Sequence, residues 1–471
     1  MIRRGRRKPD DNVWREGPIF LASDRPVAKY LGRPVADFLR VEAAGGVVLL
    51  LAAVAAMIWA NSGWSAAYDA LWHTRLGLEV DGFSMSQDLQ HWVNDALMVV
   101  FFFVVGLEIK YEIVAGHLRD PKAAALPIIA AFGGMIVPAF IYFLIAGRGD
   151  GASGWGIPMA TDIAFAVGVL GLLGRRIPPA ARVFLLTLAI VDDIGAITVI
   201  AVFYTADLSF SWLALAGVAL LSIVVLRRLR VWSMPVYVLV GVFAWFATFQ
   251  SGVHATIAGV AVGLLTPARP LLQQSVARRY ARKALEDETF SVDELDQLRF
   301  LLRESVPVVA RLQSALHPFS SYVVLPVFAL ANAGIDLRGG VLDNAVGSEV
   351  TLAVAVGLLL GKVVGITMAA WLAIRVGLGR LPRETNWAVM TGLGLVGGVG
   401  FTVSLFIAGL SFPGSQQLVG EAKVGILSAS VLSALVGALF LVVVTRSGPE
   451  GELPRNENLE VKNGAVQSRT T

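Results

Sequence analysis

The chain of 471 residues contains no cysteine and few charged side chains for its length. Without cysteine it can form neither disulfides nor thiolate metal sites. Only 16% of the residues are charged while 56% are hydrophobic, which exceeds what the core of a soluble domain needs. The formal net charge of +4 is too small to indicate nucleic-acid binding. The composition therefore predicts a polytopic membrane protein that binds no nucleic acid.

Long apolar runs recur along the whole chain, and a helix needs about 20 such residues to cross a bilayer. Lys and Arg gather in alternate connections between these runs, which the positive-inside rule assigns to the cytoplasm. We therefore expect an all-α, multi-pass protein of the cell membrane with both termini in the cytoplasm. The runs predict about twelve transmembrane helices, at roughly 42–60, 90–109, 123–146, 157–173, 181–203, 210–226, 234–249, 251–266, 319–335, 349–373, 386–410 and 423–445.

Three segments differ in composition from the apolar runs of the predicted membrane domain, residues 41–445. Residues 1–40 are basic near their start and have no apolar core, so they predict a cytoplasmic tail rather than a signal peptide. The stretch 267–317 mixes basic and acidic residues and predicts a solvated, partly helical cytoplasmic linker. Residues 446–471 have little apolar content and predict a disordered cytoplasmic tail.

A short stretch on the predicted outer side, 75–86, alternates apolar and polar residues around Asp81-Gly82. Gly accepts the positive φ that a tight turn requires, so this pattern indicates a small extracytoplasmic β-hairpin. An isolated hairpin is marginally stable in water, which favours pairing with a strand of a second subunit. We therefore expect a homodimer through 75–86, with an ordinary folded loop as the alternative.

Two adjacent carboxylates, Asp192 and Asp193, occur midway along the apolar run 181–203. An ionisable side chain near the bilayer centre costs roughly 2.5 to 3.5 kcal/mol, so each must face water, an ion or a countercharge. Neighbouring residues lie ~100° apart on a helix and cannot point the same way. Lys362, deep in the run 349–373, needs a carboxylate partner, so one Asp can meet Lys362 while the other faces a cavity. A purely structural ion pair is the alternative, but it leaves the second Asp unexplained.

Two predicted spans are interrupted by glycine. The run 157–173 is short and contains Thr161 and Asp162, and the run 386–410 is rich in glycine from Gly392 to Gly400. Such interruptions in both halves of a chain indicate discontinuous helices whose free carbonyls can ligate a cation, and Asp162 can offset the positive ends of the half-helices. With the two adjacent carboxylates and the lysine, they predict one site for a cation and protons. Glycines that serve only close helix packing are the alternative.

Several motifs resemble the NhaA family of sodium/proton antiporters, itself an established example of such broken helices. The resemblance implies twelve helices, with an inverted repeat relating spans three to five to spans ten to twelve and two discontinuous helices crossing at the membrane midplane. It also implies electrogenic, pH-regulated exchange of Na+ or Li+ for a larger number of protons by alternating access, with no cofactor and no enzymatic activity. The motifs recur in order over roughly 41–445: Val105-Gly106-Leu107-Glu108-Ile109-Lys110, Ala160-Thr161-Asp162-Ile163-Ala164-Phe165-Ala166, Leu188-Ala189-Ile190-Val191-Asp192-Asp193-Ile194-Gly195-Ala196, Ser251-Gly252-Val253-His254-Ala255-Thr256 and Val399-Gly400-Phe401-Thr402.

The resemblance also implies roles for individual residues. Asp193 resembles the family's principal cation-binding carboxylate, and Asp192 resembles its neighbour, which can pair with Lys362. Thr161 joins the cation site, and Asp162 matches the crossing of the broken helices. Residues that match family positions linked to pH response are Glu108, Lys110, Glu112, His254 and His317, with interfacial charges and an ordinary helix-terminal histidine as the alternatives. Departures from the family pattern, which put the pH response in doubt, are Tyr111, Val363 and Gln313-Ser314.

Two other functions place carboxylates inside a membrane. An intramembrane aspartyl protease needs Tyr-Asp and Gly-x-Gly-Asp motifs, whereas Asp162 follows Thr161 and Asp192 follows Val191. A cation channel fits poorly with a lysine among the carboxylates and no ring of acidic residues. The sequence therefore favours an antiporter whose partners are Na+, Li+, protons and the lipid bilayer.

Overall fold

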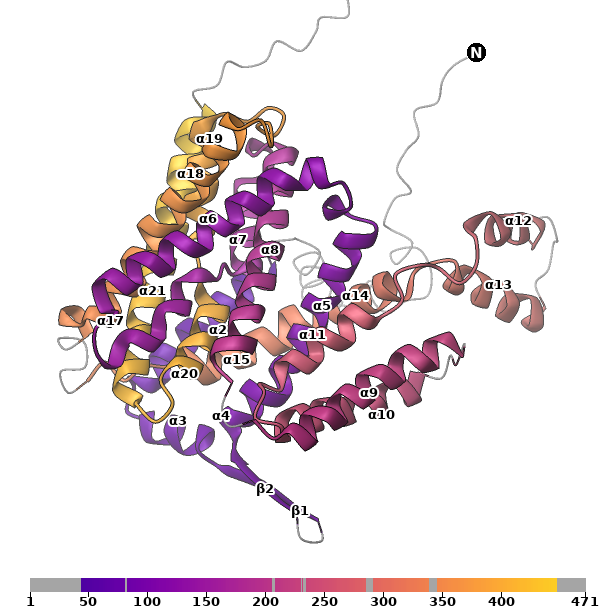
Figure 1. Ribbon diagram of the computed structural model, residues 1–471, viewed down its shortest axis with the longest axis horizontal. Helices are drawn as coiled ribbons and strands as arrows, with labels where there is room; N and C mark the ends of the chain where they lie inside the picture. The colour runs from indigo at the N-terminus through magenta and orange to yellow at the C-terminus, as the bar shows by residue number, and fades with distance from the viewer. Residues whose placement is uncertain are drawn as a thin grey trace, which may run out of the picture.

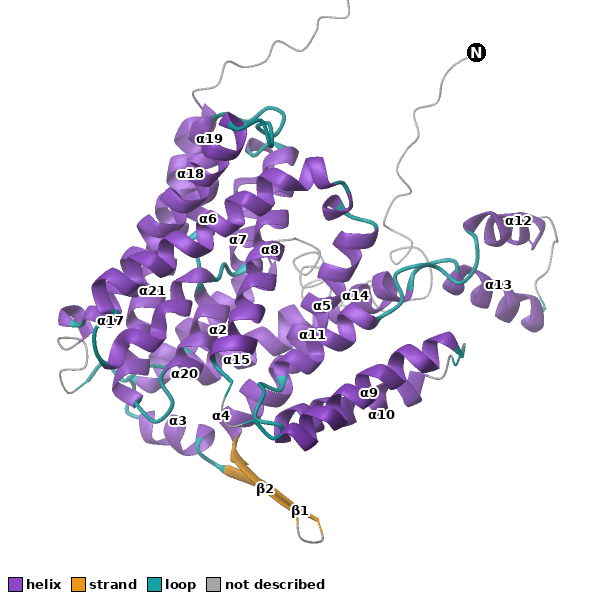
Figure 2. Ribbon diagram, viewed as in Figure 1, coloured by secondary structure: helices purple, strands orange, loops and turns teal. Residues whose placement is uncertain are grey.

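A computed structural model describes residues 44–80, 83–205, 208–229, 231, 234–284, 291–338 and 345–446. The predicted tail 1–40, the tail 446–471 except its first residue, and the Asp81-Gly82 turn lie outside these ranges. Within them the chain is almost entirely helical, with one pair of strands (Figure 2). The predicted all-α class with a small hairpin is confirmed for this part of the chain.

The elements from α2 to α9 follow one another with short connections. Their order is α2 (Ala44–Ala60), α3 (Ser65–Trp72), β1 (Arg75–Val80), β2 (Phe83–Asp88), α4 (Leu89–Trp92), η4 (Val93–Leu97), α5 (Met98–Val114), η5 (His117–Arg119), α6 (Pro121–Ala146), η6 (Asp150–Met159), α7 (Ile163–Leu173), η7 (Gly174–Arg176), α8 (Pro179–Phe203) and α9 (Phe210–Arg228).

The remaining elements include two helices, α12 and α13, that extend away from the main bundle (Figure 1). Their order is α10 (Met234–Gln250), α11 (Thr256–Leu265), α12 (Gln274–Ala284), α13 (Val292–Glu304), α14 (Val308–Phe319), η8 (Ser320–Val324), α15 (Leu325–Asn332), α17 (Glu349–Val356), η9 (Gly357–Gly361), α18 (Lys362–Arg375), α19 (Trp387–Gly397), α20 (Phe401–Ser411) and α21 (Gln416–Arg446).

Every predicted span coincides with one or more of these helices. In the described residues, 6 helices are long and apolar enough to cross a membrane, or up to 9 if each of three bent helix pairs forms one span. Two further apolar helices, 235–250 and 256–265, are shorter. A multi-pass membrane protein is therefore confirmed, while the number of twelve spans stays a prediction.

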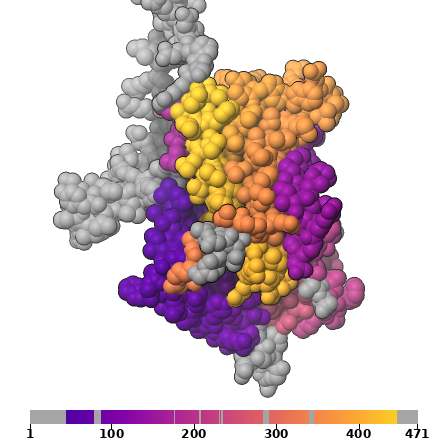
Figure 3. Space-filling view, turned by 90° about the vertical axis from the view of Figure 1, so that its left-hand side faces the viewer, coloured from indigo at the N-terminus to yellow at the C-terminus, as the bar shows by residue number. Residues whose placement is uncertain are grey.

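The outer surface of the bundle is apolar, as lipid contact requires. Figure 3 shows one face, on which α21 (yellow) lies beside α18 and α19 (orange). Large apolar side chains are exposed on α17, η9, α18, α21 and α6, among them Leu352, Leu360, Met368, Leu435, Leu439, Ile136 and Phe140. In water such a continuous apolar surface would drive aggregation, so a bilayer is its natural environment.

The two strands form an antiparallel sheet whose register runs from Arg75↔Asp88 to Val80↔Phe83. The sheet projects from one end of the bundle beyond α3 and α4 (Figure 1). At its base, Asp88 accepts a hydrogen bond from the backbone N–H of His91 and so begins α4. The predicted strand pair is therefore present, and its pairing with a second subunit stays a prediction.

Close approach of two helices at glycine fixes the position of the helix that carries Lys362. A Cβ atom built on Gly133 of α6 would overlap the carbonyl oxygen of Gly365 in α18, and one built on Gly365 would overlap that of Gly133. Small residues allow such backbone contact between membrane helices. Lys362 lies about one turn before Gly365, so the glycine contact holds the lysine backbone close to α6.

Candidate functional site

Two interruptions of helical structure lie against each other inside the bundle. The first separates η6 from α7 with a bend of 42°, and the second separates α19 from α20 with a bend of 46°. The backbone N–H of Asp162, in the first, donates to the carbonyl oxygen of Val399, in the second, at 2.7 Å. Segments more than 200 residues apart in sequence therefore meet at their unwound parts.

The side chain of Asp162 accepts hydrogen bonds from backbone N–H groups at the starts of two half-helices, α7 and α20. Its side chain is buried, and one oxygen accepts from the N–H of Phe165, which caps α7. The other oxygen accepts from the N–H of Thr402 at 3.0 Å and from the Thr402 hydroxyl at 2.6 Å, at the start of α20. A carboxylate at two helix N-termini is stabilised by both partial positive charges. The compensating role that the sequence predicted for Asp162 stays a prediction.

Asp192 is the carboxylate that meets the lysine. Lys362 Nζ lies 2.6 Å from Asp192 Oδ2, and neither side chain has any exposed surface. Thr161 Oγ1 lies 2.8 Å from the same oxygen and 2.9 Å from the carbonyl oxygen of Gly397. A hydroxyl donates one proton, so Thr161 serves one of these two acceptors at a time. Asp192 Oδ1 is buried without a hydrogen-bond partner among the described residues.

Asp193 is 4% exposed, and its Oδ1 is also buried without a partner in the described part of the chain. The site therefore holds three buried carboxylates but one buried ammonium group, that of Lys362. The helix termini offset the charge of Asp162, and the lysine offsets that of Asp192. One carboxylate remains for which these residues supply no countercharge, and an uncompensated buried charge is costly. A cation or a proton at Asp193 would remove that cost.

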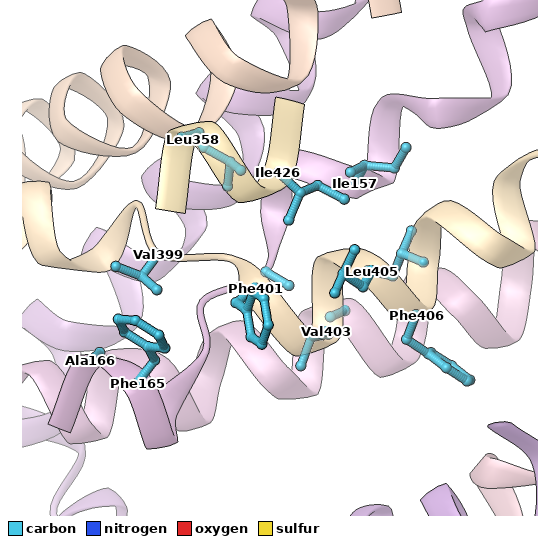
Figure 4. Close-up of a cluster of buried hydrophobic side chains, with 14 of the residues drawn as sticks. Ile157, Phe165, Ala166, Leu358, Val399, Phe401, Val403, Leu405, Phe406 and Ile426 are labelled. Atoms are coloured by element: carbon cyan, nitrogen blue, oxygen red, sulfur yellow. The ribbon is translucent and has the colours of Figure 1, made fainter. Parts of the chain in front are cut away.

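Apolar side chains surround the two breaks (Figure 4). Phe165 and Phe401 lie on the half-helices that start there, with ring centroids 6.0 Å apart, and Leu358 and Val399 are fully buried. This shell excludes water from the polar atoms, so each hydrogen bond and charge pair at the site acts at low dielectric.

A cavity of about 420 Å³ approaches the site from the ends of α5 and α14. Its lining includes Glu108, Glu112 and His317, three of the residues predicted to respond to pH. The lining reaches Ile190, one turn before Asp193 on α8, and Ile163, next to Asp162. Asp193 itself is not among the residues that line this cavity, so an Asp193 that faces a cavity stays a prediction.

The other residues predicted to respond to pH do not line this cavity. His254 lies between α10 and α11, and its Nε2 is 2.6 Å from the carbonyl oxygen of Tyr204 at the end of α8. Lys110 is half-buried on α5. Two departures from the family pattern, Tyr111 and Gln313, do line the cavity, and Gln313 Nε2 lies 3.4 Å from Glu108 Oε1.

Thr402 is the residue that reasoning from sequence missed. It stood in the motif Val399-Gly400-Phe401-Thr402, but nothing in the sequence showed that its hydroxyl would bond a carboxylate 240 positions away. Its position at the start of a predicted half-helix could have indicated this role, because a hydroxyl there can bond a capping side chain.

Comparisons with known proteins give one consistent result. The profile of the family described as Na+/H+ antiporter 1 matches residues 36–441. The Na(+)/H(+) antiporter NhaA 3 of Frankia alni is 48% identical over 417 residues, which cover 88% of this chain and 89% of that protein. The Na(+)/H(+) antiporter NhaA 2 of Sorangium cellulosum is 46% identical, with 91% and 94% of the two chains covered. The Na(+)/H(+) antiporter NhaA of Rhodopirellula baltica is 46% identical, with 89% and 95% covered.

The buried pair predicts a stability effect that depends on both partners. Lys362→Met leaves Asp192 charged and alone, which should cost about 3 to 5 kcal/mol in free energy of unfolding. Adding Asp192→Asn removes the stranded charge and should recover much of this loss. Thermal unfolding of the purified protein in detergent measures both effects.

Lys423→Met is the matched control, because Lys423 of α21 forms no ion pair with any described residue. It should lower the melting temperature much less than Lys362→Met. Equal losses for the two lysine variants, or no recovery in the double variant, would contradict a stabilising pair between Lys362 and Asp192.

Proposed function

The chain belongs to the Na+/H+ antiporter 1 family, and from that membership we propose that it exchanges Na+ or Li+ for protons at one buried site centred on Asp193, with Asp192 coupled to it. Members of this family are membrane transporters and need no cofactor, so the chain is not an enzyme and the protease alternative is set aside. Na+ and protons are its substrates.

The observation that supports this site is the unpartnered oxygen of Asp193 beside a neutralised Asp192–Lys362 pair. A carboxylate oxygen is a ligand suited to a hard cation, and the same oxygen accepts a proton. Thr161 and the free Asp192 Oδ1 supply further oxygen atoms close by. Because either occupant neutralises the buried carboxylate, Na+ and protons compete for it.

Competition at one site becomes exchange when the site opens to one side of the membrane at a time. The carboxylate loaded with Na+ or with protons is neutral and crosses between the two states more easily than the bare charged form. In the structure the cavity ends one turn short of Asp193, so a small movement of α7 or α8 would connect the two. In the alternate state of the cycle, the path from this cavity to Asp193 would be closed and a path to the opposite side of the membrane would be open.

More than one group can carry protons in this cycle, and we propose electrogenic exchange on that basis. Asp192 and Asp193 are neighbours in the chain, and Lys362 pairs with Asp192, so the charge on each group affects the others. Release of Lys362 from Asp192 would let a second proton move for each Na+. Exchange of one Na+ for more than one proton moves net charge and responds to membrane voltage.

We assign pH regulation to the cavity residues Glu108, Glu112 and His317 rather than to His254. The three share one water-accessible space with Tyr111 and Gln313, so a change of charge on any of them alters the field at the cavity floor. Lys110 and His254 keep a regulatory role only through contacts outside this cavity.

The arrangement in the membrane follows from the same premises. We propose twelve spans, an inverted repeat, and a crossing of the two broken helices near the midplane, because their unwound segments are hydrogen-bonded in the bundle interior. The charged connections place 1–40, 267–317 and 446–471 in the cytoplasm, which makes 41–445 the antiporter domain.

An impermeant thiol reagent tests this topology cleanly, because the chain has no native cysteine. A cysteine introduced by Phe290→Cys should react only after cells are opened. Reaction in intact cells would place 267–317 on the outside and reverse the orientation.

Competition predicts how Na+ affinity depends on pH. The apparent Km for Na+ should rise as pH falls, by up to about tenfold per pH unit for each competing proton, while the maximal rate stays nearly constant. Proton-coupled Na+ flux in proteoliposomes, measured over a pH series, gives both quantities. A Km independent of pH would show that Na+ and protons bind separately.

Asp193→Asn should abolish Na+ binding in isothermal titration and exchange in proteoliposomes, since the amide cannot be ionised. Asp150→Asn, at an exposed carboxylate of η6, is the matched control and should behave like the unaltered protein. Normal exchange by Asp193→Asn would place the site elsewhere.

We also propose a homodimer through the hairpin β1–β2. Its strands pair only with each other in the described chain, so their outer edges can add a strand from a second copy. Deleting 76–85 should weaken the dimer in native mass spectrometry and spare exchange, because the hairpin lies outside the bundle (Figure 1). A fully dimeric deletion variant would exclude the hairpin as the interface.

A further inference from the structure

Helices α12 and α13 form a hairpin that the exchange mechanism does not use. The hairpin interrupts the membrane helices between α11, which ends at Leu265, and α14, which begins at Val308. It extends away from the bundle (Figure 1). Both of its helices are amphipathic.

The two helices pack against each other through their facing sides. Ala277 of α12 is 2% exposed, and the Tyr280 hydroxyl donates to Gln297 Oε1 of α13 at 2.6 Å. Leu298 and Leu301 of α13 are half-buried on the face that carries this contact. The apolar face of α12 therefore already has a partner.

A second apolar stripe on α13 has no packing partner among the described residues. Val292, Leu295 and Leu302 are 75%, 54% and 46% exposed. At 100° per residue these three positions fall on one side of the helix, and Arg299 falls among them. The exposed acidic residues Asp293 and Asp296 fall on the adjoining side, with Phe300.

Both helices of the hairpin carry basic side chains, two on α13 beside its four acidic residues and four on α12. Arg299 and Arg303 are exposed on α13. Helix α12 carries four basic residues and no acidic one, and of the four Arg278, Arg279 and Arg282 are exposed. Exposed apolar side chains beside clustered Arg and Lys are the pattern of a helix that lies in the headgroup region of an anionic membrane.

The base of the hairpin is fastened next to the membrane helices. The N–H of Val309 donates to the carbonyl oxygen of Pro267 at 3.2 Å, and Arg311 of α14 pairs with Glu304 of α13 at 2.8 Å. With this base at the ends of two membrane helices, a helix of α13's 13 residues reaches roughly 20 Å. The stripe therefore stays within reach of the bilayer surface.

We propose that the α12–α13 hairpin docks on anionic lipid headgroups of the adjacent leaflet, with Val292, Leu295 and Leu302 entering the boundary between headgroups and acyl chains. Arg299 of α13 and Arg278, Arg279 and Arg282 of α12 bind lipid phosphates. The positive-inside topology makes this the cytoplasmic leaflet, where anionic lipids supply the complementary charge. Docking is independent of the ion site and adds a lipid requirement to the protein.

The test uses the full-length protein in nanodiscs of phosphatidylcholine with or without phosphatidylglycerol. Single-cysteine variants Leu295→Cys and Leu302→Cys carry an environment-sensitive fluorophore, and Asp293→Cys is the matched control on the adjoining side. Lipids with a nitroxide near the headgroup should quench the label at 295 and 302 much more than at 293. The difference should require phosphatidylglycerol and weaken in 1 M salt, where the screening length falls to about 3 Å.

A second experiment removes basic residues from α12. Arg278→Gln, Arg279→Gln and Arg282→Gln together should lower the ratio of docked to free hairpin, by about fivefold for each basic residue near the surface. Arg380→Gln with Arg383→Gln, in the connection between α18 and α19, removes charge elsewhere and should leave the quenching unchanged.

Equal quenching at 293 and 295, or quenching that does not depend on phosphatidylglycerol, would overturn the proposal. Protection of 295 and 302 from aqueous iodide without quenching by lipid nitroxides would also overturn it, since another protein or a second copy would then cover the stripe. Normal Na+ exchange in the charge variants would leave the proposed ion site intact, so the two proposals succeed or fail separately.

Discussion

Neutralising charge without water is the constraint on which the site depends. Lys362 and Asp192 have no exposed surface, and neither could remain ionised alone at that depth. Their pairing uses up the lysine and leaves Asp193 with an unpartnered oxygen. The ion pair is thus what makes the neighbouring carboxylate available, because a second lysine at the site would have satisfied both and left nothing for a transported ion to neutralise.

The broken helices are a second consequence of the same constraint. Unwinding a helix inside a membrane frees backbone groups that lipid cannot satisfy. Here Asp162 binds the starts of α7 and α20, and the carbonyl oxygen of Val399 accepts the N–H of Asp162. Thr161 links this backbone junction to the ion pair, since its one proton is within reach of both Gly397 and Asp192. A change of charge at Asp192 would therefore be felt directly at the junction of the half-helices.

Two elements at the periphery of the protein have surfaces that no other part of the described chain covers. The strand pair β1–β2 carries unpaired backbone edges, and the α12–α13 hairpin carries an apolar stripe beside arginines. The first suits another strand, and the second suits an anionic surface. Both project from the bundle, so each can acquire a partner without disturbing the helices that hold the carboxylates (Figure 1).

The sequence by itself determined the class of the protein, the places of its apolar helices, a hairpin at 75–86 and the identity of the costly polar residues. It could do so because helices and hairpins rest on local bonds, and an ionisable residue stands out in an apolar run. The pattern of residues alone left open which Asp meets Lys362, and the family resemblance implied Asp192. Only the tertiary structure shows that contact, between residues 170 positions apart, and the bond from Thr402 to Asp162. It also left Asp193 out of the cavity lining and His254 apart from Glu108. Local pattern leaves these outcomes open because they depend on how helices rotate and pack against one another, and that is set by contacts between distant segments, such as Gly133 against Gly365.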